Sequence, residues 1–333
     1  MPARCKLSVA LAALTAATVF LPSQALACTV ASASSNLGST SSYVAANSAQ
    51  QGSGSSGLSC DILLAALTPH YVGLAVDGST FQLSGPGGKT IAFAVSLTPG
   101  GTPLTVGSFQ NLSSLSLVGL FSGTNNSIPL YIRTTPTAGL RAGIYTGHID
   151  LRWHYSVCSL GVAACLSFSA SPGFVRPVPL LVPINWGSGT AVRINIELTV
   201  ENDCIIAAPN ADFGAAPLAG SFATVAQTIQ IRCSAGSAYT IGLDGGSHAS
   251  GSMRRLQSGG NYLAYDIYKG SSGTDRWGLL GAERRSSANA DNNAGIYDSI
   301  TSQAFIYRAR IDPSQPTPPA GDYSDTIRLD VEF

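Results

Sequence analysis

One strand pattern governs the prediction of the fold: Tyr323-Ser324-Asp325-Thr326-Ile327-Arg328-Leu329-Asp330-Val331-Glu332-Phe333. Apolar and polar side chains alternate along it, as they do in a strand with one buried face and one solvated face. The apolar face consists of Tyr323, Ile327, Leu329, Val331 and Phe333. No partner strand follows in the sequence, so we expect this apolar face to lack its cover.

The same passage occurs earlier in the chain. Residues 142–151 (Ala-Gly-Ile-Tyr-Thr-Gly-His-Ile-Asp-Leu) match residues 320–329 at Ala, Gly, Tyr, Ile and Leu. The earlier copy is followed by a long further segment and the later copy is not. We therefore predict two related domains, residues 28–190 and residues 191–333, of which only the first contains the material to complete itself. The strand 192–200 is predicted to open the second domain.

The composition predicts an all-β protein. Runs with period-two alternation recur, separated by turns rich in Gly and Ser, which is typical of β-sandwiches and barrels. Apolar residues make up 45% of the chain and charged residues only 11%, which argues against disorder. No basic stripe suited to nucleic acid is present.

The first residues have the pattern of a signal peptide. Arg4 and Lys6 precede an apolar run from Leu7 to Leu21, and Ala25-Leu26-Ala27 fits the small-x-small cleavage rule. We therefore assign residues 1–27 to the signal and place the mature N-terminus at Cys28. The alternative is a lipoprotein acylated at Cys28, although Ala25 stands where a lipobox usually has Leu.

Six of the seven cysteines remain after cleavage, and an even number in an exported chain favours disulfides over free thiols. The repeat predicts pairing within each copy. The expected bridges are Cys28–Cys60, Cys158–Cys165 and Cys204–Cys233. A zinc site is the alternative, but no Cys-x-x-Cys motif is present, and we expect no metal and no cofactor.

The second copy resembles a spore coat protein U domain. The matching passages are Asp203-Cys204, Asp212-Phe213-Gly214, residues 229–233, residues 239–243, residues 263–268, Trp277-Gly278 and residues 320–325. The first copy is similar through its cysteines, Tyr71-Val72-Gly73-Leu74 and the passage at Ala142. Two such domains behind a signal peptide resemble the tip adhesin of archaic chaperone–usher pili.

This resemblance implies two immunoglobulin-like sandwiches, the second lacking its final strand. Such a domain accepts a strand, first from a periplasmic chaperone and then, at the outer-membrane usher, from the adjacent pilus subunit. Tyr323, Ile327, Leu329, Val331 and Phe333 would then line the groove for the donated strand. With Cys28 as the mature N-terminus, the subunit has no donor segment of its own. We therefore expect it at the pilus tip on the cell surface.

The segment Arg176–Trp186 is apolar but contains three prolines. Because proline confines a strand to an edge or an irregular ladder, we interpret this segment as the closing edge strand of the first domain. A proline-rich linker is the alternative.

The resemblance also implies adhesion to a host or abiotic surface, and thereby biofilm formation, through apolar loops of the first domain. Three stretches are candidates: Ile62–Leu67, Leu115–Phe121 and the cystine hairpin Val157–Leu166. For Leu115–Phe121 the alternative is an ordinary core strand. The residues expected to bind the surface are Leu63, Leu64, Leu67, Leu120, Phe121, Leu160 and Val162.

We expect no enzymatic activity. His148 and Asp150 share a strand face, but no Gly-x-Ser-x-Gly motif accompanies them. Gly85–Thr90 suggests a phosphate loop, but position 83, where that motif needs its first Gly, is Leu. Two other functions remain open: a tip lectin that uses an aromatic such as Trp153 or Tyr155, and a secreted coat protein without a pilus.

Overall fold

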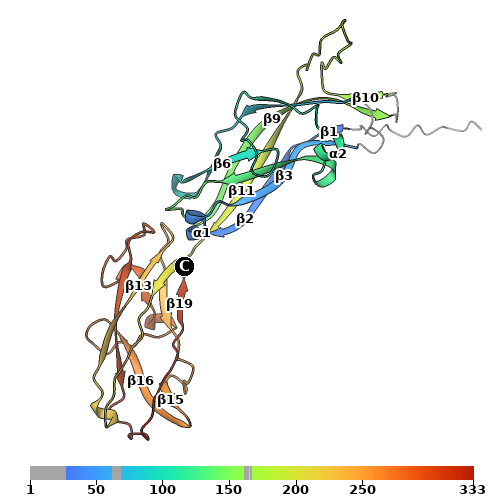
Figure 1. Ribbon diagram of the computed structural model, residues 1–333. Helices are drawn as coiled ribbons and strands as arrows, with labels where there is room; N and C mark the ends of the chain where they lie inside the picture. The colour runs from blue at the N-terminus through green and yellow to red at the C-terminus, as the bar shows by residue number, and fades with distance from the viewer. Residues whose placement is uncertain (1–27, 62–68, 161–164, 166) are drawn as a thin grey trace, which may run out of the picture.

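The computed structural model describes residues 28–61, 69–160, 165 and 167–333. They form two elongated β-sandwich domains joined end to end, with the domain junction in the middle of the molecule (Figure 1). In the described part of the chain, no helix combines the length and apolarity needed to cross a bilayer.

Domain 1 comprises residues 28–201 and contains 11 strands. Their hydrogen-bonded order is β1-β3-β8-β6-β5-β9-β11-β2, with β4 and β10 also beside β9 and β7 beside β4. The elements are β1 (Cys28–Val30), β2 (Ala33–Ser41), α1 (Ser42–Asn47), β3 (Gln51–Cys60), β4 (Tyr71–Gly78), β5 (Gln82–Ser84), η1 (Pro86–Gly88), β6 (Thr90–Ser96), β7 (Phe109–Asn111), α2 (Leu117–Leu120), η2 (Thr124–Asn126), β8 (Ser127–Thr134), β9 (Gly143–Leu160), β10 (Ser167–Ala170) and β11 (Thr190–Glu201).

The strand predicted to open the second domain instead completes the first. β11 lies antiparallel to β9 and parallel to β2, so it fills the space between these two strands of the sandwich. Alternate side chains of β11 point into the core of domain 1 because the strand period is two. These buried residues are Val192, Ile194, Ile196, Leu198 and Val200. The structural boundary therefore falls after Glu201 and not at residue 190.

Domain 2 comprises residues 202–333 and has two facing sheets, β12-β13-β18-β16-β15 and β17-β14-β19. Trp277 and Phe305 lie at the centre of its core. The elements are β12 (Cys204–Ala207), η3 (Ala219–Ser221), β13 (Val225–Cys233), β14 (Thr240–Leu243), β15 (Arg254–Ser258), β16 (Asn261–Lys269), η4 (Gly281–Glu283), β17 (Arg285–Ser286), η5 (Ser287–Asn289), β18 (Gln303–Ile311) and β19 (Leu329–Glu332).

The two domains share local features that confirm the internal repeat. The Tyr145 hydroxyl donates to the carbonyl of Arg141 at 2.9 Å, and the Tyr323 hydroxyl donates to the carbonyl of Pro319 at 2.8 Å. Each bond joins a tyrosine to the residue four positions earlier, which is the tyrosine corner of immunoglobulin-like folds. β9 and β19 are therefore equivalent strands.

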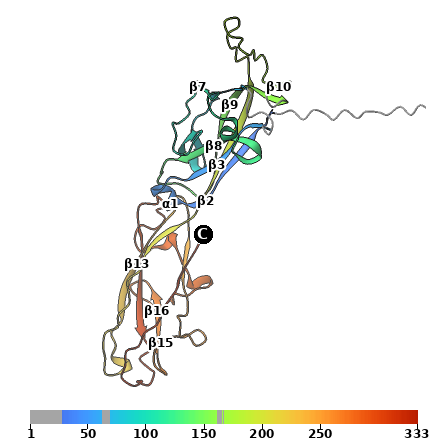
Figure 2. The ribbon, with the colours of Figure 1, turned by 45° about the vertical axis from the view of Figure 1, so that its right-hand side comes forward.

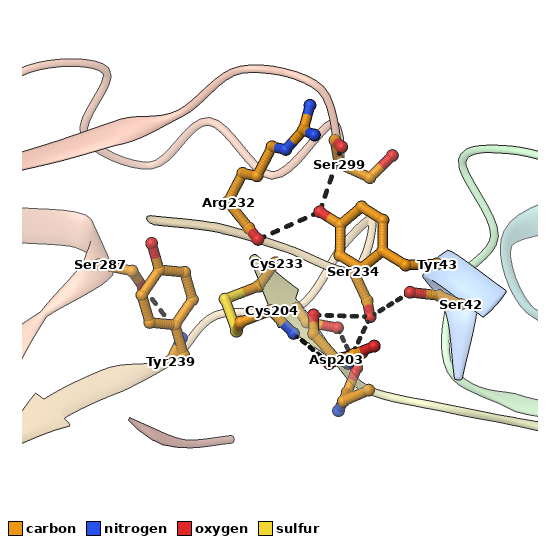
Figure 3. Close-up of a disulfide and its surroundings, with 12 residues drawn as sticks. Ser42, Tyr43, Asp203, Cys204, Arg232, Cys233, Ser234, Tyr239, Ser287 and Ser299 are labelled. Atoms are coloured by element: carbon orange, nitrogen blue, oxygen red, sulfur yellow. Dashed lines mark hydrogen bonds between the residues drawn. A yellow bond between two sulfur atoms is a disulfide. The ribbon is translucent and has the colours of Figure 1, made fainter. Parts of the chain in front are cut away.

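All three predicted disulfides are present: Cys28–Cys60, Cys158–Cys165 and Cys204–Cys233. In both domains the bridge joins paired residues of the first two antiparallel strands, with registers Cys28↔Cys60 and Cys204↔Cys233. The Cys204–Cys233 bridge lies close to the junction between the domains (Figure 3).

At the domain junction, the short helix α1 of domain 1 contacts the end of domain 2 (Figure 3). The hydroxyls of Ser42 and Ser234 lie 2.6 Å apart and are buried. The Tyr43 hydroxyl lies 3.1 Å from the carbonyl oxygen of Arg232 and 3.2 Å from that of Ser299, and can donate to either. Burial at this junction raises the pKa of Tyr43. These contacts hold the two domains in an extended arrangement.

Candidate functional site

Domain 2 contains an open groove with a cavity volume of about 920 Å³. One wall is the segment 208–222 that follows β12, and the other is the segment 317–329 that leads into β19. The floor is made of core side chains from the five-stranded sheet. Tyr323, Ile327 and Leu329 line the groove, as predicted from the alternation.

The same three positions differ sharply in burial between the two domains. Tyr145, Ile149 and Leu151 of domain 1 are each 0% exposed. Their counterparts Tyr323, Ile327 and Leu329 in domain 2 remain half-buried. In domain 1 these residues lie opposite Leu198, Ile194 and Val192 of β11. The groove of domain 2 is therefore the space that β11 occupies in domain 1.

The two walls of the groove do not pair with each other in the described structure. β19 pairs with β14 along one edge. Within the described residues, no backbone hydrogen bond joins segment 208–218 to segment 322–333. Unpaired strand edges of this kind are a template for another strand.

The two remaining residues of the predicted groove set lie beyond its lining. Val331 is half-buried against the core, and Phe333 is 55% exposed. The Phe333 ring packs on Tyr239 with centroids 6.4 Å apart. Both residues follow Leu329 on the inward face of the strand, and they extend the apolar edge toward the domain junction.

The outer face of β19 is polar and held by one arginine. Arg284 contacts Asp330 at 2.6 Å and Glu332 at 3.5 Å, and also donates to the carbonyl of Thr240. Because Thr240 belongs to β14, Arg284 fixes β19 on its partner strand. The inward face of β19 stays free for the groove.

A buried arginine ties the two sheets of domain 2 together beside the groove. Arg254 is 0% exposed, and its guanidinium contacts Asp266 at 2.7 Å. It also donates to the carbonyls of Leu243 at 2.9 Å and Trp277 at 2.7 Å. Burial lowers the pKa of Arg254, against the attraction of Asp266. Leu243 is the partner of Leu329, so this arginine supports the groove wall.

A polar cluster anchors the other end of that wall. Asp325 accepts a hydrogen bond from the Tyr265 hydroxyl at 2.7 Å, and its carboxylate lies 3.1 Å from Nδ1 of His248. Burial is the main cause that raises the pKa of Tyr265, and the hydrogen bond to Asp325 adds to it. The cluster holds the segment before Ile327 against β16.

Five of the seven residues of domain 1 that were predicted to bind a surface cannot be compared with the structure. Leu63, Leu64, Leu67 and Val162 lie outside the described residues. Leu160 ends β9, but its side chain is also outside the description. The exposure of these residues therefore remains a prediction.

The prediction that Leu120 and Phe121 are exposed is wrong. They are 6% and 3% exposed because residues 117–120 form the one-turn helix α2, capped by the Ser116 side chain. Leu117, Leu120 and Phe121 share the helix face that packs on the core. The alternative of a core strand is right about the burial of these residues, but residues 117–120 form a helix and not a strand. Leu115 and Val118 point outward instead.

The proline-rich segment forms neither a closing strand nor a linker. It is a narrow hairpin with bridges Val175↔Asn185 and Val178↔Val182, which we call the proline finger (residues 174–186). It projects from the pole of domain 1 that lies farthest from domain 2, beside β10 (Figure 1 and Figure 2). Leu180 at its apex is 106% exposed and Leu181 is 79% exposed.

Leu180 and Leu181 were not among the predicted surface residues. The sequence held a partial signal, since prolines at 177, 179 and 183 are incompatible with a regular ladder. The exposed residues of the same pole also include Leu115, Val118, Phe168, Val175, Val178 and Val182. In Figure 1, β10 and the proline finger lie at this pole, and α2 lies on the flank of domain 1 below β10.

The residues considered for catalysis or sugar binding are either paired with a neighbouring side chain or buried. Asp150 forms a two-pronged pair with Arg193 at 2.7 and 2.9 Å, which lowers the pKa of Asp150, whereas His148 is 3.8 Å away. Trp153 and Tyr155, the aromatics considered for a lectin, are buried in the core. No group of three or more metal-ligating side chains occurs among residues 28–61, 69–160, 165 and 167–333.

Comparisons with known proteins agree with this architecture. One chain in the crystal structure of the CsuC–CsuE chaperone–tip adhesion subunit pre-assembly complex, from the archaic chaperone-usher Csu pili of Acinetobacter baumannii, is 31% identical. The match has a TM-score of 0.70 and covers 92% of this chain and 100% of that chain. A second match, to CfaE, the adhesive subunit of CFA/I fimbria of enterotoxigenic Escherichia coli, is 12% identical over 91% of this chain and 93% of that chain, and its TM-score of 0.29 is too low to bear on the fold.

A comparison with curated protein sequences found no match. The family model of the Spore Coat Protein U domain matches twice, over residues 12–151 and 190–330. The second match begins at the first residue of β11, so the segment that opens the second sequence repeat closes the first structural domain. Because the two matches together span most of the sequence, the chain belongs to the spore coat protein U domain family.

Proposed function

We propose that this protein is the tip subunit of a chaperone–usher pilus, with domain 2 as the assembly domain and domain 1 as the adhesive domain. One observation carries the proposal: domain 1 is closed by β11, whereas the equivalent space in domain 2 is an open groove with an apolar floor. A subunit that ends in an open groove can accept a strand from a neighbour.

β11 is an internal model for the strand that the groove accepts. It lies antiparallel to β9 and places Val192 opposite Leu151, Ile194 opposite Ile149 and Leu198 opposite Tyr145. Transferred through the repeat, a donated strand would place apolar residues opposite Leu329, Ile327 and Tyr323. The donor should therefore alternate apolar and polar residues, with the apolar ones facing the floor of the groove.

The partners follow from this role. The similar solved chain comes from a complex between a chaperone and a tip adhesion subunit. By analogy, a periplasmic chaperone occupies the groove first. At the outer-membrane usher the adjacent subunit then takes its place. Export through the periplasm to the cell surface is the matching localisation.

The adhesive role rests on the far pole of domain 1. Apolar side chains are exposed there on the proline finger and beside α2, at the end opposite to the assembly domain. Contiguous exposed apolar surface marks an interaction site. Attachment to host or abiotic surfaces, and hence biofilm formation, would use this pole, and many pilus tips acting together would add avidity.

The proposal can be tested in cells that assemble pili from this subunit. Deleting the gene should remove tip-labelled pili and attachment to polystyrene, and restoring the wild-type gene should recover both. Replacing Leu181 with Ser should leave pilus number unchanged and reduce attachment. Attachment that persists without the subunit, or that a soluble sugar blocks, would contradict an apolar adhesin.

A further inference from the structure

The apex of the proline finger is a tight turn with an unusual residue at its centre. Pro179 occupies the first central position and the Leu181 N–H donates to the Val178 carbonyl at 3.0 Å. Leu180, at the second central position, has a φ of 64°. This is the pattern of a type II turn, in which Gly or Asn normally takes the position with positive φ. A leucine there is strained and exposed, and such strain persists mainly at functional sites.

The finger also hides its backbone donors. Pro177, Pro179 and Pro183 have no N–H group. The N–H groups of Val178 and Val182 bond across the hairpin, at 2.9 and 3.0 Å. In the described residues the N–H of Leu180 alone, among positions 177–183, lacks a protein partner. Water satisfies exposed donors without such an arrangement, whereas a hydrocarbon medium cannot.

The base of the finger carries aromatic side chains. Phe174 and Trp186 pack edge to face at 5.6 Å, and Trp186 packs on Phe109 at 5.0 Å. Gly73 leaves the space for this cluster, since a Cβ there would lie 2.5 Å from Phe109 and 2.9 Å from Trp186. Half-buried aromatics next to an apolar tip are the arrangement that proteins place at the level of lipid headgroups.

The charged side chain within the finger is basic, which suits contact with a neutral or anionic membrane surface. Arg176 is fixed at its base, over the Phe168 ring at 3.8 Å and bonded to the Ser156 carbonyl at 3.2 Å. No acidic residue occurs between Asp150 and Glu197. A membrane surface is neutral or anionic, so nothing in this segment opposes approach to it.

We propose that the proline finger inserts its apex into the interfacial layer of a lipid bilayer, with Leu180 and Leu181 in contact with acyl chains and Trp186 on the headgroup side of the inserted apex. The inference rests on the proposed adhesive function and names its substrate. The carbonyl oxygens of Pro179 and Leu180 have no partner in the described chain, so they require water or headgroups. Insertion is therefore shallow, about 5–10 Å deep.

The test uses purified residues 28–333 and large vesicles, made of phosphatidylcholine alone or with phosphatidylserine. Trp186 is a built-in reporter, because the other two tryptophans, Trp153 and Trp277, are fully buried. Vesicles should shift the Trp emission to the blue and carry the protein in flotation. Leu180→Gly and Leu181→Ser should each weaken vesicle binding by about tenfold or more.

Leu180→Gly is a safe variant because glycine suits the positive φ, so its melting temperature should stay or rise. The matched control is Leu280→Ser, which removes another exposed leucine from domain 2 and should leave vesicle binding unchanged. If the wild-type protein binds polystyrene but does not bind vesicles, the membrane inference is overturned and the adhesive function stands. Loss of cell attachment after protease treatment of the target, again without vesicle binding, overturns it in favour of a protein receptor. If the wild-type protein binds neither polystyrene nor vesicles, both the membrane inference and the adhesive function are overturned.

Discussion

Matched side chains in the two domains show what a missing strand does. Tyr145 and Tyr323 make the same corner hydrogen bond, yet Tyr145 is fully covered and Tyr323 faces the groove. The difference arises because Leu198 of β11 lies opposite Tyr145, whereas no strand residue in the described part of the chain pairs with Tyr323. The segment around Tyr323 therefore keeps the local conformation of its covered counterpart in domain 1 although no strand covers it.

Leu329→Asp should abolish capture of a donated strand, because a carboxylate in the apolar groove would have no partner once the strand covers it. Arg328→Asp is the matched control, since it introduces the same group one residue away on the exposed face. Co-purification with the chaperone measures the effect. Equal loss in both variants would show that added charge, and not the groove, is responsible.

Arg254→Leu should destabilise domain 2 by about 3–5 kcal/mol, because it leaves Asp266 without its buried partner and frees the carbonyls of Leu243 and Trp277. Asp266 keeps its contact with Arg276, which sets a limit on the loss. Denaturant unfolding measures the change. The exposed Arg310→Leu is the control, and an equal loss there would argue against a role for the buried network.

Sequence alone predicts some of these residues well. The cystine pairs and the inward residues Tyr323, Ile327 and Leu329 follow from the repeat and from alternation, both of which are local patterns. The turn at Leu180 does not follow, because a leucine with positive φ breaks the usual preference. Leu120 and Phe121 were mistaken for exposed residues, because a short apolar run does not reveal whether it turns into a helix.

β11 shows why a strand can be predicted and its place in the fold missed. Its alternation is clear from the sequence, and the family match also starts at residue 190. Its partners β2 and β9 lie far away in the chain, and pairing across such distances leaves no local signal. The sequence repeat and the structural domain therefore have different boundaries at this strand.

Ile194→Asp should unfold domain 1, because the side chain is fully buried in the strand that closes the sandwich. The expected loss is about 3–5 kcal/mol, as for other unpaired buried charges. Asn195→Asp, exposed on the next position of β11, is the control and should change stability by less than about 0.5 kcal/mol. Protease resistance of domain 1 reports the result, and equal resistance of the two variants would contradict the role of β11.

The whole molecule is a rod with the exposed apolar proline finger at one end and the open groove in the domain at the other end, joined by the contacts of α1. The Ser42–Ser234 contact is buried, and Tyr43 lies within hydrogen-bonding distance of two carbonyl oxygens of domain 2. These contacts restrict the orientation of one domain relative to the other. A rod of this kind would keep the proline finger directed away from the pilus.

Tyr43→Ala should loosen the junction without unfolding either domain. Small-angle scattering should show a broader range of interdomain distances, while both melting transitions stay within a few degrees. Val44→Ala, on the exposed side of the same helix, should behave like the wild type. An unchanged distance distribution for Tyr43→Ala would mean that other contacts hold the junction.

The most direct test of the open groove is to add a strand that can fill it and to measure the melting temperature of domain 2. The sequence of β11, residues 190–201, is appended after Phe333 through a short turn, so that it can run antiparallel to β19 as β11 does to β9. The control carries Asp at the positions of Ile194 and Ile196. Burying several apolar side chains should raise the melting temperature of domain 2 by about 10 °C or more, and the control should not. If the appended strand leaves that transition unchanged, the groove is not a vacant strand position.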